Sequence, residues 1–309
     1  MSIILQSYKH ERSALEVSGE KAAAFLNDIL TSELVLLPAG KMRMSCLLSP
    51  QGRILHDMLI YRVSSNCYWI EVASTQIKDL KKRIAMYRLR KAINIDILEN
   101  WHSAHLYHRD CSSFSATQIN QIKDDLNENQ LVFEDSRRSE LGLHIVCKKH
   151  TINLEGQSWE HIDLARWESI RIANMVPSGE IDLIPNRTLM LEANLDLFQA
   201  VDFQKGCYIG QEVTARTKYR GLVKKKIVPI SCVAPLYRDT PIFQDDRKVG
   251  SCHSSVKLQD GRYLALATIK LNAIKSNINN QIGFVSDKQS LKLELPGWYE
   301  IDDVIDKSS

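Results

Sequence analysis

The sequence predicts an α+β fold followed by a small β-barrel, and three observations support this prediction. Strand and helix periodicities alternate in the first 100 residues, and a weaker form of the same pattern continues to about residue 226. Beyond Lys226 only short β-type runs separated by turns are found. We therefore expect two α+β layers in residues 1–226 and a β-barrel domain in residues 227–309.

The first layer is predicted to have the element order β-α-β-β-β-α-β. Strands are expected at residues 13–17, 42–48, 53–63, 67–73 and 93–97, and helices at 18–29 and 77–87. Ser49-Pro50-Gln51-Gly52 joins two of the strands into a hairpin, because Pro and Gly suit a tight turn. In the second helix, Ile77, Leu80, Ile84 and Tyr87 recur at helical spacing. Two helices on a mostly antiparallel sheet are typical of a ferredoxin-like layer.

The rest of the chain has weaker patterns. A polar helix is expected at 115–126, and a second helix from Trp159 to about Met175, ended by Pro177 because proline blocks helix continuation. Beyond Lys226 helical periodicity disappears, and β-type runs occupy 227–233, 248–253, 263–270 and 291–295. These runs predict the barrel.

Composition excludes several classes of protein. Lys plus Arg number 40 and Asp plus Glu 37 in 309 residues, a net charge of +3, which lacks the overall basicity of a dedicated nucleic-acid binder. Apolar runs are shorter than the roughly 18 residues that span a bilayer, and the first residues lack a secretory signal profile. We expect a soluble, cytoplasmic protein with no membrane partner.

The seven cysteines, at positions 46, 67, 111, 147, 207, 232 and 252, have no metal-knuckle spacing. A disulfide framework or a self-contained metal site is therefore not expected. Most of these thiols lie in apolar stretches and are expected to be small buried hydrophobic groups. Cys207 is the exception.

Asp57 lies in the strand 53–63, which is apolar on both faces and is expected at the centre of its sheet. Period two places Asp57 on the face of Leu55 and Leu59, where a carboxylate needs hydrogen-bond donors or a cation because its desolvation is costly. An amine of a bound ligand would supply such a cation. Alternatively, Asp57 lies near the strand end and bonds to water or to backbone N–H groups. His56 points to the opposite face and is expected to be structural.

The segment Lys205-Gly206-Cys207-Tyr208-Ile209-Gly210-Gln211-Glu212 is the least ordinary part of the sequence. Its glycines permit backbone shapes that other residues avoid. A cysteine just before a helix N-terminus, with Lys205 beside it, gains thiolate character, which suits a nucleophile or metal ligand, although Glu212 opposes that shift. The alternative is a packed loop with an incidental thiol.

Two local patches are basic. Residues 213–231 contain no acidic residue and carry Arg216, Lys218, Arg220, Lys224, Lys225 and Lys226. A second patch, at 78–91, is most simply the solvated face of the expected helix. Either patch suits an anionic ligand tail or an acidic protein, and no nucleic-acid motif with interleaved aromatic residues accompanies them.

Leu191-Glu192-Ala193-Asn194-Leu195-Asp196, followed by Lys205 to Arg216, resembles the YgfZ family, a branch of the GcvT-like folate-binding superfamily. Leu48-Ser49-Pro50-Gln51-Gly52-Arg53 and the stretch from Asp135-Ser136-Arg137 to Leu141-Gly142 extend the resemblance. It implies ferredoxin-like domains plus a β-barrel around a folate cleft. It also implies a tetrahydrofolate-linked role in assembly or maintenance of iron-sulfur (4Fe-4S) proteins.

The resemblance also implies roles for single residues. Cys207 looks like the family's signature thiol and Lys205 like its basic partner, so both are assigned to chemistry, with Cys207 a candidate transient cluster ligand. Glu192 lies where aminomethyltransferase relatives bind the pterin ring, and a carboxylate can accept two hydrogen bonds from an aminopyrimidine edge. The residues assigned to tetrahydrofolate are Asp57, Glu192, Tyr208 and Arg216.

One departure weakens the transferase alternative. His56-Asp57 stands where the transferases carry two adjacent aspartates, so a folate-dependent aminomethyltransferase is the second hypothesis. A folate-linked tRNA-modification factor, resting on the patch from Arg216 to Lys226, is the third. A four-iron cluster on one cysteine needs ligands from another chain, so we expect a scaffold or client protein as partner.

Overall fold

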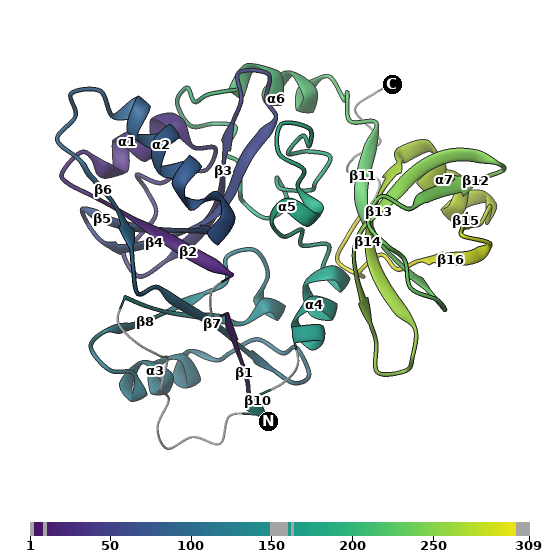
Figure 1. Cartoon of the computed structure of the whole chain (residues 1–309), viewed down its shortest axis with the longest axis horizontal. Coiled ribbons are helices and arrows are strands. Elements are labelled where there is room, and N and C mark those ends of the chain that lie inside the picture. The colour runs from purple at the N-terminus through teal and green to yellow at the C-terminus, as the bar shows by residue number, and fades with distance from the viewer. Residues whose placement is uncertain (1–2, 9–10, 149–159, 162–163, 301–309) are drawn as a thin grey trace. The chain divides into compact units, whose positions relative to one another are not determined.

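The structure is a computed structural model, which describes residues 3–8, 11–148, 160–161 and 164–300 (Figure 1). The chain divides into two compact units. Unit 1 comprises Met1–Leu48, Leu55–Asp163 and Leu197–Ile209, and unit 2 comprises Ser49–Ile54, Leu164–Asp196 and Gly210–Ser309. The predicted boundary at residues 226/227 stays a prediction.

The first sheet of unit 1 confirms the predicted ferredoxin-like layer. Its strands run in the order β3-β4-β5-β2-β6. Strand β2 pairs antiparallel with both β5 and β6, and β4 pairs antiparallel with β5. The two strands joined by each helix crossover are therefore separated by at least one other strand, as in a ferredoxin-like layer. Strand β3 adds one strand at the edge, next to β4. The strand bounds are β2 Arg12–Ser18, β3 Met42–Leu48, β4 Ile54–Ser64, β5 Cys67–Ala73 and β6 Asn94–Leu98.

Helices α1 (Ala22–Ile29) and α2 (Ile77–Arg88) cover one face of this sheet, and the short η1 (Ser74–Gln76) leads into α2. Apolar residues of both helices pack on the strands in one core cluster that includes Phe25 and Leu80. The residues predicted at helical spacing lie on α2, where Ile77, Leu80 and Ile84 are buried and Tyr87, in the last turn, is 38% exposed.

The second sheet of unit 1 runs in the order β10-β1-β7-β9-β8. Its strands are β1 Ile3–Tyr8, β7 His102–His108, β8 Gln130–Glu134, β9 Leu143–Cys147 and β10 Glu160–His161. Helix α3 (Ala116–Asp125), close to its predicted bounds, packs Ile119 and Ile122 on this sheet. The 3-10 turn η2 (Ser139–Leu141) precedes β9.

Large aromatic side chains fill the space between the two sheets. Tyr61 on β4 packs against Phe133 on β8, with ring centroids 5.0 Å apart, and Trp69 on β5 meets Trp101 edge to face at 5.6 Å. The layers of unit 1 are therefore helices, sheet, sheet and helix (Figure 1).

Unit 2 contains the predicted β-barrel. Six strands close in the order β11-β14-β13-β12-β15-β16. They are β11 Lys225–Cys232, β12 Pro241–Gln244, β13 Arg247–Lys257, β14 Tyr263–Lys270, β15 Phe284–Ser286 and β16 Gln289–Leu293. The prediction that no helix follows Lys226 is wrong, because α7 (Leu271–Asn280) lies between β14 and β15 in the chain order. Its residues Ala273 and Ile274 are buried.

Three further helices precede the barrel in unit 2: α4 (Leu164–Ala173), α5 (Gly179–Asp182) and α6 (Gln211–Tyr219). The predicted start at Trp159 lies outside the described residues, and Glu160–His161 form a strand instead of helix. Buried Arg171 on α4 donates to Asp182 on α5, whose other carboxylate oxygen accepts the Ser254 backbone N–H of β13. None of the described helices is both long and apolar enough to cross a bilayer.

Candidate functional site

The structure describes all seven cysteines, and Cys207 alone is exposed. Cys46, Cys147, Cys232 and Cys252 are buried, and Cys67 and Cys111 are intermediate. Burial raises the pKa of the Cys46 thiol well above its usual range, and the Asp57 charge adds to that shift. A buried thiol whose pKa is raised is a poor nucleophile and a poor metal ligand. Cys207 is therefore the thiol best placed to meet another molecule.

Lys205 anchors the Cys207 segment inside unit 1. Its ammonium donates to the backbone oxygens of Leu30, at 2.8 Å, and Ser32, at 2.7 Å, just after α1. Burial lowers the pKa of Lys205 to about 8, although nearby carboxylates oppose the shift. The ammonium thus holds the loop in place, and the chemical role assigned to Lys205 stays a prediction.

Tyr208, next to Cys207 in this segment, is buried. The Lys205 ammonium lies 5.4 Å from the centre of its ring, a cation-π contact. The ring is 7% exposed, and its hydroxyl has no hydrogen-bond partner among the described residues. Burial and the nearby Asp202 and Cys46 groups raise the pKa of Tyr208, so the hydroxyl keeps its proton. Such a group has a donor to offer to a ligand.

Asp57 is also buried in unit 1, on β4. Its charge adds to the raised pKa of the buried Cys46 thiol. The assignment of Asp57 to tetrahydrofolate stays a prediction. His56 points toward the helices and bonds Gln76, at 3.0 Å, and Asp79, at 2.9 Å, so its predicted structural role is confirmed.

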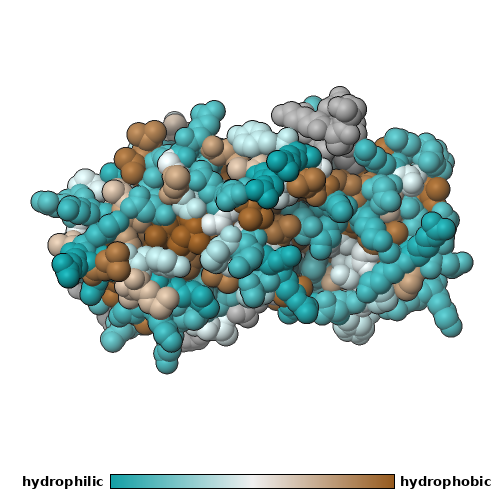
Figure 2. Space-filling model, turned by 90° about the horizontal axis from the view of Figure 1, so that it is seen from above, coloured by the Kyte–Doolittle hydropathy of each residue, from teal (hydrophilic) through white to brown (hydrophobic). Residues whose placement is uncertain are grey.

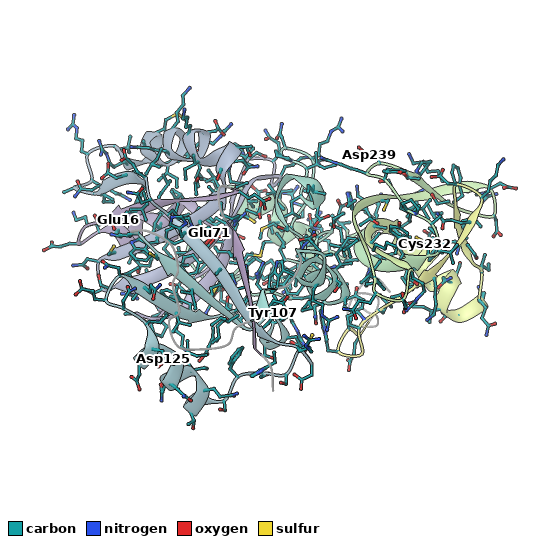
Figure 3. All side chains as sticks on the ribbon, turned by 60° about the horizontal axis from the view of Figure 1, so that its bottom comes forward. Glu16, Glu71, Tyr107, Asp125, Cys232 and Asp239 are labelled. Atoms are coloured by element: carbon teal, nitrogen blue, oxygen red, sulfur yellow. The ribbon has the colours of Figure 1, made fainter. Side chains whose placement is uncertain are left out.

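A buried polar network between the two sheets of unit 1 was missed by the sequence analysis. Arg12 donates to Glu71, at 2.8 Å, and the Tyr61 hydroxyl donates to the other oxygen of Glu71, at 3.0 Å (Glu71 is labelled in Figure 3). His144 joins Tyr61, at 3.1 Å, to Asp135, at 2.7 Å. The only sequence signal was the Asp135-to-Gly142 stretch in the family resemblance.

Backbone geometry fixes Asp135 within this network. Arg137 bonds both of its carboxylate oxygens, and the Asp135 N–H donates to Gly142 O at 3.0 Å. Gly142 has φ +76°, and a Cβ there would lie 2.0 Å from the Leu106 carbonyl oxygen, so only glycine fits. Although burial alone opposes it, the charges of Arg137 and His144 hold the pKa of Asp135 far below its usual range.

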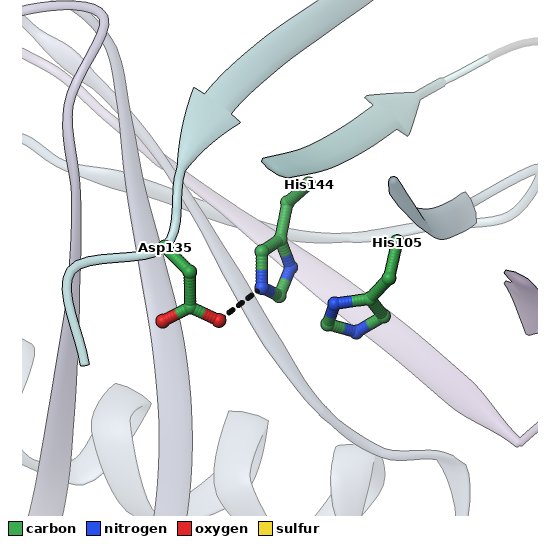
Figure 4. A group of neighbouring side chains, drawn as sticks. All are labelled: His105, Asp135 and His144. Carbon is green, nitrogen blue, oxygen red and sulfur yellow. Dashed lines mark hydrogen bonds and ion pairs between the residues drawn. The ribbon is translucent and has the colours of Figure 1, made fainter. Parts of the chain in front are cut away.

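His105, Asp135 and His144 have the composition of a metal-ligand set, with ligand atoms within 4.8 Å of one another (Figure 4). The hydrogen bonds argue for another use. Both ring nitrogens of His144 are already engaged, Nδ1 with the Tyr61 hydroxyl and Nε2 with Asp135. Both carboxylate oxygens of Asp135 also accept hydrogen bonds from Arg137. We therefore interpret this group as an ion-pair network that joins the sheets.

Glu192 and Arg216, also assigned to folate, belong to unit 2. The Glu192 side chain is 13% exposed and lies 3.4 Å from the Lys225 ammonium. Near it in sequence, the buried Asn194 donates to Ile227 O, and its own Oδ1 has no described partner. Arg216 is 53% exposed and paired with Glu212 at 2.6 Å. Glu192 is thus the better enclosed of the two predicted ligands.

A cavity of about 450 Å³ lies elsewhere in unit 1, between α3 and the connection from β8 to β9. Both of its arginines are already paired, Arg137 with Asp135 and Arg138 with Glu140. Its lining therefore has no surplus cation to recognise an anionic ligand.

Comparison with known proteins supports the fold. Residues 10–105 match the family model described as the GCVT N-terminal domain. The structure resembles the crystal structure of glycine cleavage system aminomethyltransferase T from Bartonella henselae, with a TM-score of 0.74 at 16% identity over 94% of this chain and 85% of that one. The chain therefore has a GcvT-like fold, as the resemblance implied.

Curated relatives point to a narrower group. The chain is 29% identical over 245 residues to the human iron-sulfur cluster assembly factor IBA57, mitochondrial, covering 73% of this chain and 65% of the relative. It is 29% identical over 226 residues to the Neurospora crassa homologue, covering 71% and 51%. The chain thus spans about half to two thirds of the length of these relatives. Its homologues are iron-sulfur cluster assembly factors, while membership of the YgfZ branch stays a prediction.

The predicted cytoplasmic location is wrong, because these relatives are named as mitochondrial proteins. The physical reason is that the lack of an apolar secretory segment argues only against secretion. Mitochondrial import uses amphipathic segments, which a hydropathy profile does not detect.

Proposed function

We propose that this chain is an iron-sulfur cluster assembly factor that binds tetrahydrofolate and uses Cys207 as its working thiol. The single observation that carries the proposal is the exposure of Cys207 on a loop that Lys205 fixes from inside. The iron-sulfur role of the curated relatives supports the same conclusion. Their mitochondrial location is proposed for this chain as well.

Each unit offers polar groups that suit tetrahydrofolate. In unit 1, the buried Tyr208 hydroxyl has no described partner, and Asp57 is a buried carboxylate on β4. In unit 2, Glu192 offers a mostly buried carboxylate that would suit an aminopyrimidine edge. Each residue is proposed as a folate ligand on its own evidence, and bound folate would supply one-carbon chemistry or an assembly signal.

The decisive experiment measures the activity of a 4Fe-4S enzyme in cells that lack this gene. The cells are complemented with wild type, Cys207→Ala or Cys67→Ala at equal protein level. Cys67 is a matched control, because it is partly exposed but burial raises the pKa of its thiol to about 11. We expect wild type and Cys67→Ala to restore activity and Cys207→Ala to fail. Equal rescue by all three would exclude the thiol role.

The folate assignment has its own test. Glu192→Gln keeps the shape of the side chain but replaces an acceptor oxygen with a donor, so tetrahydrofolate affinity should fall by roughly 1 to 3 kcal/mol. Titration calorimetry with tetrahydrofolate measures this change, and Glu128→Gln, at an exposed position between α3 and β8, serves as the control. Unchanged affinity in Glu192→Gln would remove this residue from the folate site.

A folate-dependent aminomethyltransferase is the second candidate, favoured by the likeness to aminomethyltransferase T. The position of His56 disfavours it, because its ring is held by Gln76 and Asp79 on the helix side of the sheet. Asp57 therefore has no adjacent carboxylate to share proton transfer. Tetrahydrofolate-dependent release of ammonia from an aminomethyl donor would favour this alternative.

A further inference from the structure

The outward face of α2 combines positive charge with exposed apolar side chains. Residues 77–91 contain seven basic residues and a single acidic one, Asp79. Met86, near the end of the helix, is 60% exposed, and Leu89, directly after the helix, is 82% exposed. Hydrophilic residues cover most of the molecular face that Figure 2 shows, so apolar side chains are the minority on that surface. We use the name α2 face for Lys78, Lys82, Met86, Leu89 and Arg90.

Helix geometry places the helical members of this group on one side of α2. Leu80 and Ile84 are buried in the core between the helices and the sheet. Lys82 and Met86 each follow one of these buried residues by two positions, a rotation of about 200°, so they point away from the sheet. Lys78 continues the same i,i+4 row toward the start of the helix. The α2 face therefore belongs to the outer helical layer of unit 1 (Figure 1).

The positive charge of the α2 face is not neutralised by the part of the chain that the structure describes. Lys78, Lys82 and Arg90 are exposed and have no ion-pair or hydrogen-bond partner among the described residues. The acidic residue of the segment, Asp79, is already held by Arg83 at 2.6 Å. The α2 face is therefore complementary in charge to a negatively charged surface.

Leu89 is displayed at a cost to the backbone. The Lys91 N–H donates to the Arg88 carbonyl oxygen at 3.0 Å and closes a tight turn, in which Leu89 has φ 50° and ψ −118°. These angles are typical of the first central position of a type II′ turn, which favours glycine because a side chain is crowded there. A helix face that met only water would explain the lysines, but not a leucine that is held in solvent at a glycine-type position. A backbone outlier that displays an apolar side chain indicates a role in binding.

We propose that the α2 face binds the surface of a bilayer that contains anionic phospholipids, independently of the proposed function. Lysine is depleted in protein–protein interfaces, whereas Lys and Arg beside exposed apolar side chains are typical of surfaces that bind anionic lipids. Leu89 and Met86 would enter the headgroup layer, and the three unpaired cations would contact phosphate groups. The expectation of no membrane partner rests on apolar runs too short to span a bilayer, and a surface contact needs no spanning run.

The test measures co-sedimentation of the full chain with vesicles of phosphatidylcholine alone or of phosphatidylcholine mixed with phosphatidylglycerol. We expect wild type to bind only the anionic vesicles, and the binding should fall steeply between about 0.1 M and about 1 M salt, because salt screens the attraction. Lys82→Gln should lower the partition coefficient about fivefold. Lys123→Gln is the matched control and should have no effect, because Lys123 is exposed on α3, in the outer layer on the other side of unit 1.

Leu89→Gly separates binding from folding. Glycine suits the backbone angles of residue 89 and removes the apolar side chain, so this variant should unfold at a higher temperature than wild type while it binds anionic vesicles less tightly. Val233→Ser is the control for loss of an exposed aliphatic side chain, because Val233 is 75% exposed and belongs to unit 2. It should bind like wild type. A lower unfolding temperature for Leu89→Gly with unchanged binding would overturn the inference, because the leucine would then serve the fold.

Two further outcomes would contradict the lipid contact. Failure of wild type to bind anionic vesicles would overturn it, and an acidic protein would then be the better occupant of the α2 face. Wild-type binding by Lys82→Gln, or equal weakening by Lys123→Gln, would overturn the assignment to this face. None of these outcomes bears on the proposed function, which rescue of 4Fe-4S enzyme activity tests separately.

Discussion

At the scale of residues, the Cys207 segment is held by two side chains that do not themselves reach solvent. Lys205 has its ammonium on two backbone oxygens, and Tyr208 places its ring beneath that ammonium. Desolvation lowers the pKa of Lys205 to about 8, and the charges of nearby carboxylates, Glu33 first among them, partly offset this shift. These contacts fix the loop that displays the exposed Cys207 thiol.

The Tyr208 hydroxyl yields a prediction with two readouts. Because it is buried without a described partner, Tyr208→Phe should leave the free energy of unfolding unchanged or raise it by up to about 1 kcal/mol. The same variant should bind tetrahydrofolate less tightly. Urea unfolding and titration calorimetry measure the two effects. A large decrease in the free energy of unfolding would show that the Tyr208 hydroxyl already has a hydrogen-bond partner in the protein without folate.

His105 predicts a pH dependence of stability. Burial, together with the positive charges of His144 and Arg137, holds the pKa of His105 well below 6.5. As the pH falls below about 6.5, the unfolded chain binds a proton that the folded chain does not, so the free energy of unfolding decreases.

Urea unfolding at pH 7.5, 6.0 and 5.0 measures this effect. As the pH falls, the free energy of unfolding should decrease more steeply for wild type than for His105→Gln. Glutamine does not titrate, so this variant removes only that proton. Identical slopes for the two proteins would contradict the proposed neutral state of His105.

At the scale of elements, α3 shows how a polar helix is stabilised at its start. The Ser115 hydroxyl accepts the Gln118 N–H, and the Gln118 side chain accepts the Ser115 N–H, which makes a capping box. Helices of ten residues are marginal in isolation, so this cap and the packing of Ile119 and Ile122 together stabilise α3.

Ser115→Ala should therefore lower the free energy of unfolding by about 1 kcal/mol. The loss arises because the Gln118 N–H is left without its side-chain acceptor. Ser112→Ala, in the loop before the helix, is the control and should change stability less. Chemical unfolding measures both variants, and equal effects would argue against the cap.

At the scale of the whole molecule, the chain returns to unit 1 after building part of unit 2. The segment Leu197–Ile209 belongs to unit 1 and carries the Cys207 loop. Thr31 links it to the N-terminal part, since its hydroxyl donates to Ala200 O and its carbonyl oxygen accepts the Asp202 N–H at 3.0 Å. The Cys207 loop is thus supported by residues about 170 positions away in sequence.

Thr31→Val tests this support. The substitution keeps the shape but removes the hydroxyl that also accepts the Cys46 N–H, so two buried backbone groups lose their partner. We expect a loss of about 2 to 4 kcal/mol in the free energy of unfolding. Thr75→Val, at an exposed position, should be close to neutral. A small effect of Thr31→Val would show that the segment is held by packing alone.

The sequence by itself determined the local elements and singled out Cys207, the cysteine that the structure leaves exposed. Strands β3 and β5 begin and end at the predicted residues, and the buried positions of α1 follow its 3.6-residue period. These features depend on neighbours in the chain, which a sequence displays directly. The GcvT-like fold was likewise visible from the motif around Cys207, because its glycines and charged residues are contiguous.

Only the tertiary structure decided which distant residues meet. The sequence placed Lys205 beside Cys207, whereas the fold directs its ammonium to Leu30 and Ser32. The network through His144 and Asp135 joins two sheets whose strands are far apart in the sequence, so no periodicity could predict it. The physical reason is that hydrogen bonds and ion pairs depend on distances in space, which chain spacing specifies only within one element.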